Sequence, residues 1–329
     1  MSLKPGHAIS IGMDEAIHFI QGHQSFLVVG HHHPDGDAIG SICALHNVIR
    51  SMGKEADMIL ADPVPEAYTT IEAAAKITTE IPKGKTYDAL IFADLANIER
   101  AGDFDFPDVP SLCIDHHETN EGYADFLYLK GEYAAAAEVV AEMLFAMGIS
   151  LDKDTCNALY MGIATDSGFF KFSCTSANTL LMASQLVKLG AEPAYISAKI
   201  DEKTEEAMKC HQRVVETLKT YEKGQIAIAC MDEKAMALDG ENADSYASIP
   251  RCLKGVEIAG LFKYEGENSY RISLRSVRYA NVAKLAGEFG GGGHARAAGC
   301  KMKGTFEDCR SRLVEAMARY LYWMELLMY

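Results

Sequence analysis

The most informative stretch of the sequence runs from Phe26 to Ser41 and reads FLVVGHHHPDGDAIGS. Its first residues, Phe26-Leu27-Val28-Val29, form an apolar run of strand length, which is typical of a parallel-sheet strand buried on both faces. A helical pattern follows over 38–52, so the histidines and aspartates between the two elements lie at the carboxyl end of the strand. Open α/β sheets bind their ligands at that edge.

The rest of the first half repeats this alternation of apolar runs and helical patterns. Further strands are predicted at 56–60, 88–93 and 111–114, and further helices at 134–147, 156–165 and 177–189. The alternation predicts an α/β domain, a parallel sheet with helices on both faces.

From Gly224 the pattern changes to that of a smaller α+β domain, which we expect to lie across a cleft from the first. Its expected strands are 226–229, 258–262 and 270–274, and its last helix is 306–321. The highly charged stretch before it has a helical period and predicts a connecting helix. The expected domains are therefore 1–200, a connecting helix at 201–222, and 223–329.

Composition limits the classes of function. The chain has 329 residues, of which 49% are hydrophobic and 23% charged, which suits two globular domains. Its net charge of −15 argues against long duplex nucleic acid as a partner. There is no apolar run long enough for a membrane span and no signal-peptide pattern at the N-terminus. The 9 cysteines are odd in number and lack a C-x-x-C pair, so we expect free thiols and a cytoplasmic location.

Acidic and imidazole side chains recur at the ends of the predicted elements. His31, Asp35 and Asp37 can face one pocket, and an imidazole with two carboxylates suits Mn²⁺ or Mg²⁺, although Pro-Asp-Gly-Asp is also a good turn. Three more segments place such groups after a strand or at a helix end: Asp94, Asp115-His116-His117 and Asp166. A role as a turn or helix-cap residue could explain each of these groups singly, but it would have to hold at all of these places independently. The sequence therefore favours a metal site.

These motifs, in this order, resemble the DHH phosphoesterase superfamily. The pattern H-x-x-P-D-x-D-A-x-G-S is followed by an Asp after a strand, by D-H-H and by T-D-x-G-F. The segment 291–299, GGGHARAAG, matches the G-G-G-H-x-x-A-A-G signature of the DHH-associated C-terminal domain, and Ser273-Leu274-Arg275-Ser276 also fits. The resemblance spans about residues 13–320 and is strongest to the nanoRNase / 3′-phosphoadenosine-5′-phosphate (pAp) phosphatase branch, which is related to RecJ.

The resemblance implies a catalytic N-terminal domain with two Mn²⁺ ions, Mg²⁺ being the alternative. One ion would be held by His31, Asp35 and Asp94, and the other by Asp37, Asp94, His116 and Asp166. A hydroxide bridging the two ions would attack the phosphorus. Asp115 would orient a ligating imidazole, and His117 would face the phosphate and stabilise or protonate the leaving oxygen. Asp94, Asp115 and His117 are thus the expected catalytic residues.

Substrate binding is expected in the C-terminal domain. Gly291, Gly292 and Gly293 lack Cβ atoms, so their backbone N–H groups can approach an anion, and His294 can donate to the same phosphate. Arg275 offers a planar fork for a phosphate or a stacking face for a base. The alternative for the glycine run is a flexible turn.

The resemblance therefore implies a hydrolase that cleaves short oligoribonucleotides to 5′-mononucleotides and converts pAp to AMP. Two alternatives stay open: a phosphodiesterase of cyclic or linear dinucleotides such as c-di-AMP and pApA, and an inactive nucleotide-binding sensor. No role is assigned to His32, His33, Arg100 or Lys171. The apolar segment 320–324 is compatible with a packed helix end or with a homodimer contact.

Overall fold

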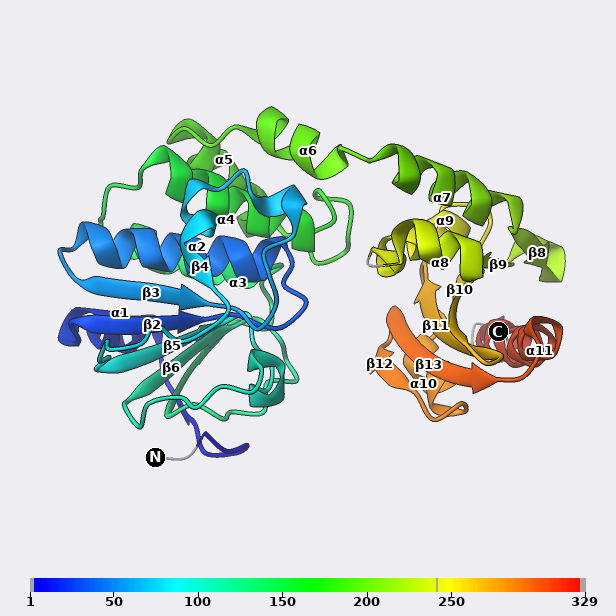
Figure 1. The fold of residues 1–329 in the computed structure, drawn as a ribbon, viewed down its shortest axis with the longest axis horizontal. Coiled ribbons are helices and arrows are strands. Elements are labelled where there is room, and N and C mark those ends of the chain that lie inside the picture. Colours follow the sequence, from blue (N-terminus) through cyan, green and yellow to red (C-terminus); the bar gives the residue numbers. More distant parts are fainter. Residues whose placement is uncertain (1–2, 241, 326–329) are drawn as a thin grey trace. The chain divides into compact units, whose positions relative to one another are not determined.

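The computed structural model describes residues 3–240 and 242–325, and side chains as far as residue 321. The chain divides into two compact units, Met1–Glu202 and Lys203–Tyr329, each with its own sheet. Figure 1 shows the elements of both units. Each unit is described below by itself.

The first unit is built on a 7-stranded sheet with the order β1-β7-β6-β5-β2-β3-β4, in which every described pair is parallel. The arrows of β2 and β3 point the same way in Figure 1. The strands are β1 (Ile9–Ser10), β2 (Ser25–Val29), β3 (Glu55–Ile59), β4 (Ile77–Thr78), β5 (Ala89–Ala93), β6 (Ser111–Asp115) and β7 (Phe126–Leu129). β5 and β6 are buried along their whole length, which explains their uninterrupted apolar sequences.

The α-helices of this unit share one large core with one face of the sheet. Val28, Ile91 and Ile114 point from the strands into that core, where they meet residues of the helices. The helices are α1 (Met13–Gly22), α2 (Gly36–Ser51), α3 (Ala136–Ala146), α4 (Lys153–Asp166), α5 (Ala177–Lys188) and α6 (Pro193–Asp201), with 3-10 helices η1 (Glu66–Tyr68) and η2 (Glu72–Lys76).

The opposite face of the sheet is covered by loop residues and one 3-10 helix, η3 (Ile98–Ala101). Leu27 and Phe92 face this side, and Phe92 packs edge-on against Tyr123 and Phe106. A parallel sheet that is buried on both sides is the predicted arrangement. Among the described residues, however, helical cover on this second side is limited to η3, because aromatic loop residues supply the rest of the apolar surface.

The second unit has a 6-stranded mixed sheet with the order β12-β13-β11-β10-β9-β8. Only β9 and β10 pair in parallel, and the other described pairs are antiparallel. The strands are β8 (Lys219–Tyr221), β9 (Ile226–Met231), β10 (Ile258–Gly266), β11 (Ser269–Ser276), β12 (Gly292–His294) and β13 (Ala297–Lys303).

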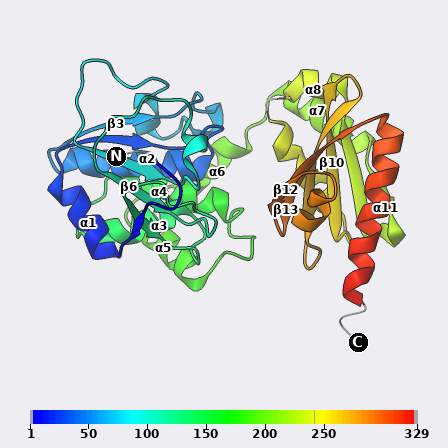
Figure 2. The same cartoon turned by 90° about the horizontal axis from the view of Figure 1, so that it is seen from below.

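Helices pack on both faces of this second sheet. On one face, Ile228, Phe262 and Ile272 meet α10 (Val282–Gly287) and α11 (Phe306–Glu325), and Figure 2 shows α11 alongside the strands. On the other face, Ala229 and Leu261 meet residues of the remaining helices. These are α7 (Glu205–Glu216), α8 (Glu233–Asp239), η5 (Ala243–Ala247) and α9 (Ser248–Arg251), and η4 (Glu222–Gly224) precedes β9.

The predicted fold class is confirmed: a parallel-sheet α/β domain is followed by a smaller α+β domain. The charged stretch expected as a connecting helix at 201–222 contains α7 and β8. Although most of α7 is exposed and charged, its Ala207, Cys210 and Val214 are buried, and Cys210 and Val214 belong to a core of the second unit.

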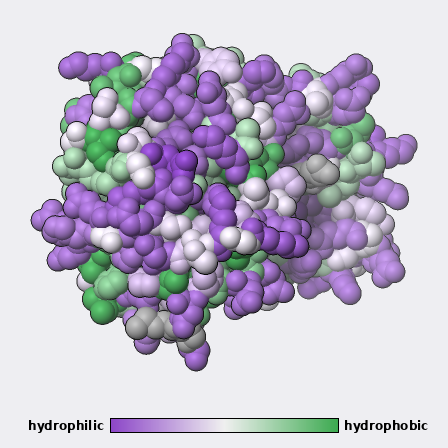
Figure 3. All heavy atoms as spheres, turned by 60° about the vertical axis from the view of Figure 1, so that its left-hand side comes forward, coloured by the Kyte–Doolittle hydropathy of each residue, from purple (hydrophilic) through white to green (hydrophobic). Residues whose placement is uncertain are grey.

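The surface is mostly polar where Figure 3 shows it, and hydrophobic residues form small separate groups there. In the part of the chain that the structure describes, no helix combines the length and the apolarity that a membrane span requires. All 9 cysteines are free, and only Cys174 and Cys252 are exposed. Of the segment 320–324, Leu321 is buried in the core of the second unit, whereas the side chains of 322–324 lie outside the described part.

Candidate metal centre

Strand order creates the position of the candidate site. β2 and β5 are neighbours in the sheet, but the chain continues from β2 to β3 on one side and from β5 to β6 on the other. The loops after β2 and β5 therefore diverge, which leaves a crevice at the carboxyl ends of these two strands. The loop that starts at Gly30 follows β2, Asp94 follows β5, and Asp115 is the last residue of β6.

The loop after β2 is fixed by its own aspartates. Asp35 is the N-cap of α2, where its Oδ1 accepts hydrogen bonds from the backbone N–H groups of Asp37 and Ala38 at 3.0 and 3.1 Å. The carboxylate of Asp37 accepts from the N–H groups of Ala136 and Ala137, at 2.7 and 2.8 Å, at the start of α3. The buried Asp37 thus joins two helix N-termini, whose dipoles favour its negative charge.

Close packing of α4 brings Asp166 to the same place. A Cβ atom on Gly162 would lie 2.5 Å from the Cβ of Ala137 and 3.0 Å from Oδ1 of Asp37. Only glycine lets α4 approach these residues so closely. Asp166, one turn further along α4 and its last residue, then lies beside His116.

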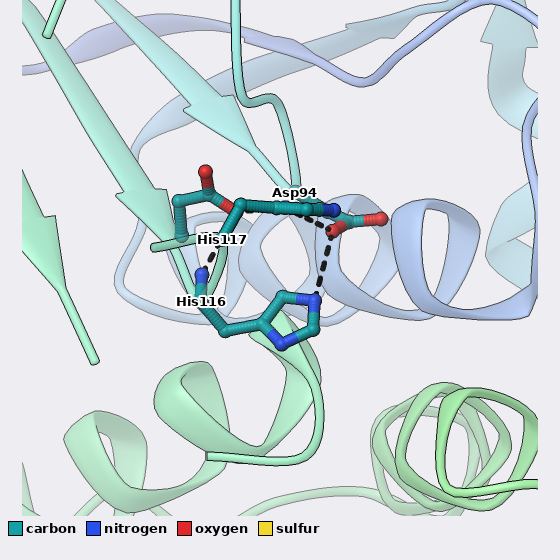
Figure 4. Close-up of side chains that lie close together, drawn as sticks. Asp94, His116 and His117 are labelled. Carbon is teal, nitrogen blue, oxygen red and sulfur yellow. Dashed lines mark hydrogen bonds and ion pairs between the residues drawn. The ribbon is translucent and has the colours of Figure 1, made fainter. Parts of the chain in front are cut away.

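Asp94 is the residue around which the cluster is organised. It is 2% exposed and has a left-handed backbone conformation with φ of 56°. His31 Nε2 lies 3.3 Å from Asp94 Oδ2, and His116 Nε2 lies 3.6 Å from Asp94 Oδ1. His117 Nδ1 is also 3.6 Å from Oδ1, and Figure 4 shows Asp94, His116 and His117 side by side. Strand ends and loops that are distant in sequence thus converge on one carboxylate.

Two groups of ligand atoms adjoin Asp94. On one side, Nε2 of His31 lies 3.7 Å from Oδ1 of Asp35. On the other side, Nε2 of His116 lies 3.5 Å from Asp166 Oδ2 and 3.8 Å from Asp37 Oδ2. In each of the sets His31–Asp35–Asp94 and Asp37–His116–Asp166, the ligand atoms lie within 4.8 Å of one another. The structure therefore brings together the six residues that the sequence singled out as metal ligands.

Backbone carbonyl groups orient the two imidazoles. Nδ1 of His31 lies 2.8 Å from the carbonyl oxygen of His32, and Nδ1 of His116 lies 3.2 Å from that of Tyr133. Nδ1 therefore carries a proton that it donates to the carbonyl oxygen, and Nε2 is directed toward the carboxylates. This is the usual arrangement of a histidine that binds a metal ion.

Unlike Asp94, Asp115 has both of its carboxylate oxygens engaged in hydrogen bonds with neighbouring residues. Its Oδ1 accepts hydrogen bonds from the backbone N–H of His116 and from Nδ1 of His117, both at 2.8 Å. Its Oδ2 accepts one from Nδ2 of Asn120 at 2.6 Å. Asp115 is therefore a fully buried acceptor that orients the adjacent histidines.

The sequence analysis assigned no role to Asn120. Its position three residues after His117 was the one feature that could have indicated such a role. Its amide also donates to the carbonyl oxygen of Leu95, and its Oδ1 accepts from the N–H of Gly122. Asn120 thus ties the loop after β6 to the loop after β5, and holds Asp115 between them.

Replacing Asn120 tests this arrangement. Asn120→Asp keeps the shape but puts a second carboxylate against Asp115, so we expect turnover and the affinity for divalent metal ions to fall about 10–100-fold, as for other residues that support metal ligands by hydrogen bonds. Metal titration and steady-state kinetics measure both quantities. The matched control is Asn97→Asp, which changes the cap of η3 instead. Unchanged metal affinity and turnover in Asn120→Asp would contradict the positioning role.

Without cations, the electrostatics of this cluster of carboxylates would be unfavourable. Burial and the charges of Asp94, Asp166 and Asp35 raise the pKa of Asp37 well above its usual value. Burial also raises the pKa of Asp94, and it raises the pKa of Asp166 to about 6. Burial would lower the pKa of His31, but hydrogen bonds to Asp35 and Asp94 raise it to about 10. The carboxylates therefore need protons or cations in order to lie together.

The donor set fits divalent cations. Oδ1 of Asp94 is buried and has no hydrogen-bond partner among the described residues, although it faces two imidazoles. An orphaned buried carboxylate oxygen is costly unless a cation or a donor reaches it. Carboxylate oxygens with imidazole nitrogens, and no thiolate, suit Mn²⁺ or Mg²⁺.

The nearby residues that were left without a role lie around the cluster rather than in it. The backbone N–H of His32 donates to the carbonyl oxygen of Arg100 at 2.7 Å, and its Nδ1 lies 2.9 Å from the same oxygen. His33 is 87% exposed, and Nζ of Lys171 lies 6.0 Å from the centre of the Phe169 ring. His32 therefore joins its loop to η3.

The residues expected to bind substrate lie in the second unit. A cavity of about 760 Å³ is lined by Arg275 and by Gly290–Gly293. His294 is exposed at the end of β12 and is not among the lining residues. The structure thus brings Arg275, Gly291, Gly292 and Gly293 to one cavity.

The glycines also have a packing role that the sequence did not suggest. A Cβ atom on Gly291 would lie 2.1 Å from the carbonyl oxygen of Gly299, and one on Gly293 would lie 2.7 Å from that of Ala297. The N–H of Gly291 already donates to the carbonyl oxygen of Ala286. Close approach of this segment to β13 therefore requires two of the glycines, whereas a Cβ atom on Gly292 would meet nothing within 4 Å.

Comparison with known families agrees with the two units. The model of the DHH family, N-terminal domain, matches residues 25–163, and that of the DHHA1 domain matches residues 212–322. The chain thus carries a DHH domain followed by a DHHA1 domain. Its first unit contains the DHH domain with the candidate metal centre, and its second unit contains the DHHA1 domain with the cavity.

Several curated relatives are similar to this chain over most of their length. A bifunctional oligoribonuclease and PAP phosphatase NrnA from Thermus thermophilus is 27% identical over 89% of this chain and 89% of the relative. The protein of the same name from Mycoplasma pneumoniae is 26% identical over 91% and 96%. An exopolyphosphatase-related protein from Bacteroides fragilis has the same fold, with a TM-score of 0.84 and 23% identity over 96% of both chains.

Proposed function

We propose that this DHH chain is a metal-dependent phosphoesterase that hydrolyses short oligoribonucleotides to 5′-mononucleotides and pAp to AMP. The observation that carries the proposal is the position of Asp94 between two groups of ligand atoms. The names of the relatives, which are oligoribonucleases and PAP phosphatases, support this choice of substrates.

Two divalent ions fit the described residues. His31, Asp35 and Asp94 would hold one, and Asp37, His116 and Asp166 would hold the other together with Asp94. When bound, the ions supply Lewis-acid activation of a phosphate and of water at neutral pH. Mn²⁺ is our preferred pair because two imidazoles take part, and Mg²⁺ is the alternative.

The chain's own residues position and protonate the substrate. Asp115 accepts from Nδ1 of His117 and directs the other ring nitrogen away from itself. Burial lowers the pKa of His117, but the hydrogen bond and charge of Asp115 outweigh it and raise that pKa. The raised pKa favours the protonated form of His117, which would donate its proton to the leaving oxygen.

In the second unit, Arg275 and the glycine segment bind a phosphate or base of the nucleotide. Arg275 lines the cavity and donates from Nη1 to the carbonyl oxygen of Leu274, which fixes part of its fork. His294 would add a donor from the exposed end of β12.

Most of the cysteines are buried free thiols, which supports a cytoplasmic location. We also propose that the chain forms a homodimer.

Activity should depend on added metal. We expect phosphate release from pAp and cleavage of a labelled RNA dinucleotide to stop in EDTA and to return with Mn²⁺, because the metal ions would supply the Lewis-acid activation of phosphate and water. A cyclic dinucleotide, pApA and longer labelled oligoribonucleotides are assayed alongside. Hydrolysis of pAp and the dinucleotide that continues undiminished in EDTA would contradict the metal centre. Hydrolysis of the cyclic dinucleotide alone would contradict the proposed substrates.

A further inference from the structure

The cavity of the second unit carries three cationic side chains besides Arg275, which the proposed function already uses. Lys263, Arg271, Arg275 and Lys301 line it, and Asp244 contributes the one carboxylate among the lining residues that the structure describes. The whole chain has a net charge of −15. A cationic cavity in an acidic protein is a local site for an anion.

The cations lie together because of strand alternation. Arg271, Ser273 and Arg275 alternate along β11 and share one face of the sheet, while Ile272 and Leu274 enter the core on the other face. On the adjacent strand β13 their partners in register are Lys301, Gly299 and Ala297. Small residues thus form part of the cavity floor between basic side chains.

Lys263 is the most unusual of these residues. Its side chain is 2% exposed, and its Nζ donates to Ser273 Oγ at 2.8 Å and to the carboxylate of Asp244. A buried ammonium group is costly unless an anion accompanies it. The accompanying anion, Asp244, is supplied by the short helix η5, and its side chain is 60% exposed.

Asp244 lies where three donors converge. Besides Lys263, Ser273 Oγ donates to its Oδ1 at 2.9 Å, and Arg271 Nη1 lies 3.6 Å from its Oδ2. An ammonium, a hydroxyl and a guanidinium around one half-exposed carboxylate resemble the donor set that binds a phosphate group.

We propose that Lys263, Ser273 and Arg271 form an anion subsite for a phosphomonoester group, and that Asp244 occupies this subsite until such a group displaces it. A phosphomonoester has more charge and one more terminal oxygen than a carboxylate, so it satisfies the three donors better. The subsite deepens the proposed function, on which its assignment to a nucleotide rests: it recognises a terminal phosphate that is not the one hydrolysed.

The test measures binding without turnover. The full chain in EDTA is titrated by calorimetry with AMP, adenosine and inorganic phosphate. Asp244→Asn removes the competing charge, so AMP should bind about tenfold more tightly while the affinity for adenosine stays the same. Lys263→Met should weaken AMP binding by a similar factor. The controls are Glu267→Gln and Lys303→Met, exposed residues of the same sheet region outside the cavity lining.

Each result has a defined meaning. The side chain of Asp244 is 60% exposed, so Asp244→Asn should leave the fold intact. This variant is expected to bind AMP more tightly, whereas a damaged protein would bind it more weakly. It therefore decides the test even if Lys263→Met fails to fold. Weaker or unchanged AMP binding in Asp244→Asn would overturn the subsite, and so would an equal gain for adenosine, which would place Asp244 against a sugar or base. A gain for inorganic phosphate alone would overturn the assignment to a nucleotide. Failure to hydrolyse pAp with Mn²⁺ would refute the proposed function but leave these binding results standing.

Discussion

Asp94→Asn should reduce Mn²⁺-dependent hydrolysis of pAp by at least about a thousandfold, equivalent to about 4 kcal/mol of transition-state stabilisation. Among the residues that the structure describes, Asp94 is the one carboxylate that reaches both groups of ligand atoms, with Oδ2 at 3.3 Å from His31 Nε2 and Oδ1 at 3.6 Å from His116 Nε2. An amide keeps the size of the side chain but supplies one weaker oxygen ligand in place of two. Steady-state kinetics over a range of Mn²⁺ concentrations measures the loss.

Thermal unfolding separates this loss from damage to the fold. Burial raises the pKa of Asp94 because it disfavours the charged carboxylate, and an uncharged amide of the same size removes that cost. In EDTA the variant should therefore unfold at a temperature no lower than that of the unaltered chain. Mn²⁺ should raise the unfolding temperature of the unaltered chain but not that of Asp94→Asn.

The exposed substitution Asp103→Asn removes the same charge outside the cluster and is the control. It should leave both the kinetics and the response to Mn²⁺ unchanged. An Asp94→Asn protein that retains its activity, or is stabilised by Mn²⁺ as much as the control is, would show that Asp94 does not hold the metals.

The central strands β5 and β6 could be predicted from the sequence because both of their faces are buried. The apolar runs at 56–60, 88–93 and 111–114 correspond within one residue to β3, β5 and β6. The edge strands β1 and β4 have 2 residues each, too few for any hydrophobic pattern, and were not predicted. Pairing with a neighbouring strand, rather than local sequence, creates them.

The candidate site could be located because its residues follow strands in a fixed order. Strand ends of a parallel sheet share one edge, so aspartates and histidines after β2, β5 and β6 must meet there. Contacts made by single residues could not be predicted in this way. Asn120 supports Asp115 from within a loop, and Asp244 reaches Lys263 from another element 19 residues away. Neither contact leaves a periodic signal.

Gly40→Ala should lower the stability of the first unit by about 2 kcal/mol. A Cβ atom at this position of α2 would lie 2.3 Å from the carbonyl oxygen of Ala158 in α4, and backbone atoms cannot rotate away. Overpacking of this kind costs about 1–3 kcal/mol or more, and the higher helix propensity of alanine offsets about 1 kcal/mol of that cost. Thermal unfolding of the full chain in EDTA should show an earlier transition.

Gly40→Ala should also lower the rate of pAp turnover, by more than the loss of folding stability alone would explain. The two helices that must separate also carry Asp37, at the start of α2, and Asp166, at the end of α4. A displacement of about 1 Å between catalytic groups costs on the order of a hundredfold in rate, so turnover of pAp should fall by that factor at a temperature where the protein stays folded. Gly22→Ala is the matched control, because this glycine ends α1 and a Cβ atom there meets nothing within 4 Å. If Gly40→Ala proved as stable and as active as Gly22→Ala, the contact between α2 and α4 would not be what sets the distance between the two carboxylates.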